Sequence, residues 1–135
     1  MKKKIIIVLG LLLVLGLSFG VYIIKNKSEF HVVINNETNE TINGLEISSG
    51  GTSDNIKVSG IEAGKSKDLV VKTKEAGNLV MYYTDIAGNY HKEILAGYYK
   101  PGADGKVIVN ITSVDAFGVY SMEIASPAAE ALENN

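Results

Sequence analysis

The chain of 135 residues contains no cysteine, no tryptophan and no arginine, and it has only two prolines. The absence of cysteine excludes disulfide bonds, thiolate metal ligands, a lipid-modified cysteine and a cysteine nucleophile. An exported domain without disulfides has to be stabilised by its own hydrophobic core. This pattern suits many exported proteins of Gram-positive bacteria.

Positive charge is scarce beyond the N-terminus. Three of the 13 lysines are Lys2, Lys3 and Lys4, so the rest of the chain carries ten lysines against 15 acidic residues, or about −5. Nucleic-acid binding depends on Lys and Arg that neutralise phosphates, and anionic lipid attracts the same residues. We therefore expect no nucleic-acid partner and no domain that lies flat on a membrane.

A long uncharged segment covers residues 5–24, and 15 of its 20 residues are Ile, Leu, Val or Phe. At about 1.5 Å per residue it forms a helix of roughly 30 Å, the thickness of a bilayer's hydrocarbon core. The basic residues 1–4 should stay in the cytoplasm, which places residues 25–135 outside. The segment thus predicts a single-pass transmembrane helix, retained as a signal anchor and embedded in the lipid bilayer.

A cleaved signal peptide is the alternative interpretation of this segment. Ser18-Phe19-Gly20 is a poor match to a small-x-small cleavage site, and the apolar run continues beyond it to Ile24, which favours retention of the segment. Gly16 and Gly20 have the GxxxG spacing that lets membrane helices pack closely, so a weak homodimer through the helix is a further hypothesis. Residues 25–28 form a short spacer, so the outer domain should lie close to the membrane.

Alternating apolar and polar residues dominate residues 29–125 and predict about eight short strands. One face is apolar in the first strand and again in residues 106–113, and residues 78–99 have the pattern of a hairpin. A second strand is expected over residues 41–48, with a bulge at Gly44. We expect a mainly β domain: a small antiparallel β-sandwich, immunoglobulin-like in shape, with a small β-barrel as the alternative. Residues 126–135 should form a flexible tail.

Residues with catalytic or metal-binding potential are few. His31 and His91 are single histidines in predicted strands, where a structural role is the commoner one. The loop aspartates do not follow a calcium-loop spacing and are expected to cap turns. We therefore expect no enzyme, no cofactor and no metal.

Tyrosines are the most informative residues, because six of the seven lie between positions 82 and 120. Tyr82, Tyr98 and Tyr99 are the candidates for a binding platform on one face of the sheet. The alternative is that tyrosines occupy strands because they suit pleated, half-buried surfaces.

The sequence defines no molecular function, and two hypotheses follow from it. The first is a non-enzymatic module that binds another exported or membrane protein, in an envelope or secretion assembly or as an inhibitor of an exported toxin. The second is a module that binds glycan or a small ligand through the tyrosine-rich face.

The anchor hypothesis makes a direct prediction. The chain with residues 1–24 intact should sediment with membranes and should be released by detergent but not by high salt. Protease added to intact cells should digest residues 29–125 and leave the lysine-rich start protected. Recovery of the intact chain in the soluble cytosol would contradict the hypothesis.

Overall fold

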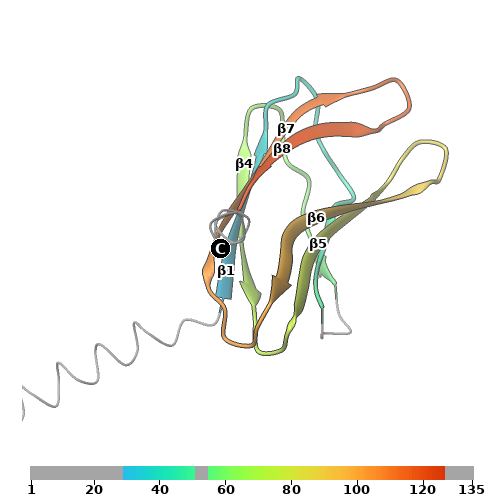
Figure 1. Cartoon of the computed structure of the whole chain (residues 1–135). Coiled ribbons are helices and arrows are strands. Elements are labelled where there is room, and N and C mark those ends of the chain that lie inside the picture. Colours follow the sequence, from blue (N-terminus) through green and yellow to red (C-terminus); the bar gives the residue numbers. More distant parts are fainter. Residues whose placement is uncertain (1–28, 51–54, 127–135) are drawn as a thin grey trace, which may run out of the picture.

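Two four-stranded sheets make up the described part of the protein (Figure 1). The computed structural model describes residues 29–50 and 55–126. The strand orders are β4-β1-β7-β8 in the first sheet and β3-β2-β5-β6 in the second. The strands are β1 (Glu29–Asn36), β2 (Glu46–Ser49), β3 (Ile56–Lys57), β4 (Ser66–Lys72), β5 (Gly77–Thr84), β6 (Tyr90–Tyr99), β7 (Gly105–Val114) and β8 (Tyr120–Ala125).

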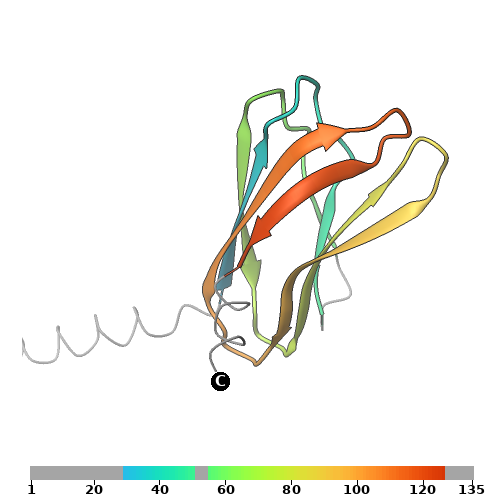
Figure 2. The same ribbon diagram turned by 45° about the horizontal axis from the view of Figure 1, so that its top comes forward.

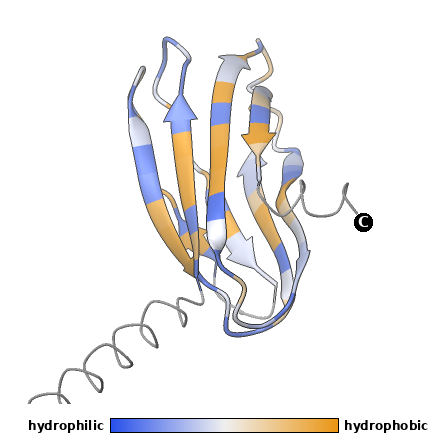
Figure 3. Cartoon of the chain, turned by 60° about the vertical axis from the view of Figure 1, so that its left-hand side comes forward, coloured by the Kyte–Doolittle hydropathy of each residue, from blue (hydrophilic) through white to orange (hydrophobic). Residues whose placement is uncertain are grey.

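The core lies between the two sheets, and the alternation of the sequence explains it. Phe30, Val32 and Ile34 of β1 are buried, as predicted, and so are the apolar residues at positions 107, 109 and 111 of β7. Figure 3 shows the same alternation as hydrophobic and hydrophilic bands along the strands. Residues from both sheets form one core cluster, an arrangement consistent with a small β-sandwich.

The expectation of a purely antiparallel sandwich is wrong at one pair of strands. β1 and β7 are parallel neighbours, with Phe30 opposite Gly105 and Asn36 opposite Ile111. All other strand pairs are antiparallel. Alternation shows which residues share a face, but it does not define the partner of a strand or its direction.

Two further expectations need correction. The strand expected over residues 41–48 is shorter, because Gly44 has a φ of 75° that interrupts the extended chain, and β2 begins only at Glu46. Only an isolated bridge, from Ile42 to Ile61, precedes it. The described strands form two separate sheets, which does not match the alternative of a closed barrel.

The β5–β6 hairpin is present as predicted, and β5 is an inner strand of its sheet with both neighbours paired. β6 is an edge strand. Glu93 of β6 pairs with the buried Met81, so its carboxylate is on the core-facing side of the sheet. An inward-facing charge on an edge strand disfavours pairing with a strand from another molecule.

The domain has two different ends. The start of β1 lies at one end, together with the β4–β5 and β6–β7 turns, whereas the β5–β6 and β7–β8 loops extend side by side at the other (Figures 1 and 2). We refer to these two loops, residues 85–89 and 115–119, as the hairpin tips. Across the described residues, no helix is long and apolar enough to cross a membrane. The predicted helix of residues 5–24, with Gly16 and Gly20, lies outside them.

The assignment of faces can be tested by stability. Ile34→Ala should lower the free energy of unfolding by about 2–5 kcal/mol, because the side chain is fully buried between the sheets. Val70→Ala is the control, since Val70 is 46% exposed on the outer side, and it should change this free energy by less than about 0.5 kcal/mol. Urea denaturation of the full chain in detergent, followed by tyrosine fluorescence, measures both values. Equal losses would contradict the assignment.

Candidate binding surface

The three candidate tyrosines do not share one surface. Tyr82 lies on the outer side of β5, and Tyr98 of β6 is 69% exposed. Tyr99 is only 5% exposed and packs edge-to-face on Phe30, with ring centroids 5.3 Å apart. Burial raises the pKa of the Tyr99 phenol. Adjacent residues of a strand point to opposite faces, so Tyr98 and Tyr99 cannot form one outer platform.

Two residues outside the predicted set belong to the outer face. Tyr90 is 63% exposed and stacks on Tyr82, with ring centroids 5.2 Å apart and planes 20° apart. Ile94, two positions beyond Lys92 on β6, is 57% exposed. The register explains this arrangement, because Tyr82 pairs with Lys92 and is therefore diagonal to Tyr90. We refer to Tyr82, Tyr90, Ile94 and Tyr98 as the β6 surface.

The β5–β6 tip is closed by an aspartate and a glycine. Asp85 accepts a hydrogen bond from the backbone N–H of Asn89 at 2.8 Å, and Gly88 has a φ of 86°. The backbone N–H of Gly88 donates to the carbonyl of Asp85 at 3.0 Å. An Asp at the start and a left-handed Gly at the fourth position are typical of a three-residue hairpin loop.

The β7–β8 tip repeats this chemistry. Asp115 accepts hydrogen bonds from the backbone N–H groups of Phe117 and Val119, at 2.8 and 2.9 Å, and Gly118 has a φ of 80°. The two tips are joined, because the N–H of Ile86 donates to the carbonyl of Phe117 at 3.0 Å. The expectation that Asp85 and Asp115 cap turns is confirmed.

Each tip exposes a large apolar side chain. Ile86 is 79% exposed and Phe117 is 70% exposed. Next to them lies a cleft of about 380 Å³, lined by the two tips and by residues 40–42. Glu40, Asp115 and the ring of Tyr120 are part of its wall. We refer to it as the tip cleft.

His91 contacts both an aspartate and a tyrosine ring. Its Nε2 lies 3.0 Å from the Asp85 carboxylate, and its ring stacks on Tyr83 with centroids 4.7 Å apart. A hydrogen bond from His91 is the largest cause that lowers the pKa of Asp85 to about 2, and hydrogen bonds from Asn89 lower it further. Both carboxylate oxygens of Asp85 are used in the loop. Asp85 therefore caps the turn, and the contact with His91 stabilises the position of its carboxylate.

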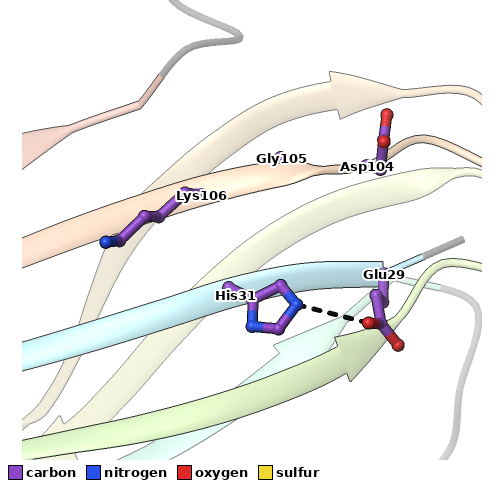
Figure 4. Close-up of a pocket in the computed structure, with 5 residues that line it drawn as sticks. All are labelled: Glu29, His31, Asp104, Gly105 and Lys106. Carbon is purple, nitrogen blue, oxygen red and sulfur yellow. Dashed lines mark hydrogen bonds and ion pairs between the residues drawn. The ribbon is translucent and has the colours of Figure 1, made fainter. Parts of the chain in front are cut away.

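The opposite end of the domain has a second cleft of about 380 Å³, lined by Glu29, His31, Asp104, Gly105 and Lys106 (Figure 4). Glu29 is paired with Lys72 at 2.6 Å and with His31 at 3.2 Å. The Lys72 hydrogen bond is the main cause that lowers the pKa of Glu29. Within the described residues no group of three or more His, Cys, Asp or Glu side chains could hold a metal ion.

Comparisons with known proteins place the chain in no family. No protein-family model matches it, and no curated protein matches it either. A solved structure described as the NMR structure of a protein from Eubacterium rectale is similar, with 13% identity and a TM-score of 0.46. That similarity covers 73% of this chain and 90% of the other. A function for this chain therefore has to be inferred from its own surface.

The link between Asp85 and His91 can be tested by titration. We expect the Asp85 carboxyl, followed by the NMR shift of its Cγ, to titrate with a midpoint of about 2. Because a lowered pKa in the folded state stabilises above the unfolded value of 3.8, this contribution should vanish as the pH falls from about 4 through 2. His91→Ala should raise the midpoint toward 3.8, whereas His31→Ala, in the other sheet, should leave it unchanged. An unshifted midpoint in His91→Ala would contradict the link.

Proposed function

We propose that the chain is a single-pass membrane protein whose outer domain, an immunoglobulin-like sandwich, binds another exported or membrane protein without catalysing a reaction. One observation supports this most directly. Six large apolar side chains are exposed in the described residues, and all except Val70 lie on β6 or on the hairpin tips. A bias of this kind toward one side of a small domain is typical of an interaction surface.

The chemistry of the β6 surface suits a protein partner. Tyrosine gives a large contact area and a polar hydroxyl at a low cost in conformational entropy, and tyrosines are enriched at protein interfaces. Isolated apolar residues on a surface need no explanation, but Ile94 lies between two exposed tyrosines of the same strand. The partner should bind these side chains and not the backbone edge of β6, because Glu93 and Lys92 disfavour strand addition.

The biological setting follows from the anchor hypothesis and stays a proposal with it. A domain tethered by residues 25–28 would meet partners near the outer surface of the membrane. An envelope or secretion assembly would supply such partners, and so would an exported toxin that the domain inhibits.

A second candidate function is supported by the Tyr82–Tyr90 pair. A stacked aromatic pair with one ring 63% exposed offers a flat face to which the apolar side of a sugar ring or a small planar ligand could bind. A glycan-binding or small-ligand module would depend on these two rings, whereas a protein interface would also need Ile94 and Tyr98.

A double substitution separates the two functions. Ile94→Thr with Tyr98→Ser removes apolar contact area at exposed positions, so folding should be little affected. Crosslinking of the full chain in intact cells should trap a discrete protein partner, and the yield should fall by about tenfold or more in this variant. Val70→Thr, on the outer side of the other sheet, is the matched control and should keep the yield.

An unchanged yield in the double variant would show that the β6 surface is not the interface. Retention of the detergent-solubilised full chain on purified cell-wall material, lost in Tyr90→Ala but kept in the double variant, would support the second function instead.

A further inference from the structure

The tip cleft has an unbalanced charge. Glu40 and Asp115 are the only charged residues in its wall, and both are acidic. The ion pairs found among the described residues join other side chains, and none involves either carboxylate. The cleft is therefore a negative site with no cation of its own.

Two tyrosines lie near this charge: Tyr120 is in the wall of the cleft, and the ring of Tyr83 contacts that of Tyr120. Burial raises the pKa of the Tyr120 phenol, and the neighbouring Tyr83 and Glu40 raise it further. The pKa of Tyr83 is likewise raised, first by burial and then by carboxylates that include Asp115. In both cases burial is the main cause, and nearby carboxylates add to it.

The cleft is also preorganised. The side chain of Asn36, itself 1% exposed, donates hydrogen bonds to the carbonyls of Glu40 and Ile61, each at 2.8 Å. On the other side, the turn that carries Asp115 is held by its own carboxylate and by the hydrogen bond between the tips. A site fixed in this way loses little conformational entropy when a ligand binds.

From this geometry we propose that the tip cleft receives a lysine or arginine side chain of the partner protein, while an apolar residue next to it in the partner packs on Ile86 and Phe117. This inference rests on the proposed protein-binding function and specifies its chemistry. Two carboxylates attract the cation and form charge-assisted hydrogen bonds with it, and the Tyr120 ring adds a cation–π contact. The exposed apolar tips favour a protein segment over a free cation, because a free cation would leave them in water.

A photocrosslinking probe can locate the contact. Replacement of Phe117 by p-benzoylphenylalanine keeps an aromatic ring at the tip, and probes at Tyr98 and Lys106 report the β6 surface and the opposite end. With the full chain in the native membrane, the Phe117 probe should crosslink one protein. Mass spectrometry should place the crosslink within about three residues of a Lys or Arg in that protein. A probe at Ile86 serves as the second variant for the same contact.

Charge substitutions test the cation. Glu40→Gln with Asp115→Asn removes two negative charges but keeps an oxygen that accepts the turn hydrogen bonds of Phe117 and Val119. The crosslink yield should fall by about tenfold, the larger part of what two partly exposed ion pairs provide. Asp104→Asn with Glu123→Gln changes the net charge equally, away from the cleft, and should keep the yield.

The outcomes distinguish this inference from the function on which it rests. A yield that survives Glu40→Gln with Asp115→Asn, or a crosslink site without Lys or Arg nearby, would overturn the inference. A partner trapped only by the Tyr98 probe would overturn it as well, but it would leave the protein-binding function standing. No crosslinked protein at any of the probes would overturn both.

Discussion

The parallel pairing of β1 with β7 determines which loops lie at each end of the domain. Because both strands run in the same direction, Glu29 and Gly105 begin at one end, and Asn36 and Val114 finish at the other. The β7–β8 tip therefore has to lie at the end remote from Glu29, and its hydrogen bond to Ile86 brings the β5–β6 tip beside it.

The hairpin tips keep their shape without help from the side chains that they expose. In each tip an aspartate and a left-handed glycine make the turn, and the central positions of such a turn accept most residue types. Neither Ile86 nor Phe117 is needed for the turn itself, and both leave most of their apolar surface in water. The residue type at these positions is thus free to serve contact with another molecule.

The sequence predicted the composition of the core better than the arrangement of the strands. Phe30, Val32 and Ile34 could be assigned to the interior because alternation with period two states directly which residues share a face. The parallel partner of β1 could not, since the two strands are separated by most of the domain and no local pattern links them. Gly44 was recognised as an irregularity, but with its positive φ the regular strand begins only after it, at Glu46.

The arrangement of the tyrosines could be predicted only in part. The three candidate tyrosines lie on paired strands, yet the choice between Tyr98 and Tyr99 for the outer face depends on β6, whose pairing with β5 shifts register on either side of Leu79. At such shifts two successive residues, Leu95 and Ala96, are both buried, so simple alternation fails there. The stacking of Tyr90 on Tyr82 and the contact between the tips could not be predicted, because both depend on neighbours in another strand or hairpin, which local sequence does not show.

The position of the tips relative to Glu29 and the net charge of the domain together indicate how the domain would be oriented on the proposed anchor. If residues 5–24 span the bilayer, the Glu29 end faces the lipid, and the tip cleft points away from it. Anionic headgroups repel a domain of about −5, which opposes tilting of its sides onto the membrane. The acidic cleft would then be the part that a cationic partner meets first, and long-range attraction would speed that encounter most at low salt. The net negative charge that opposes contact of the domain with anionic lipid thus also favours a basic partner at the hairpin tips.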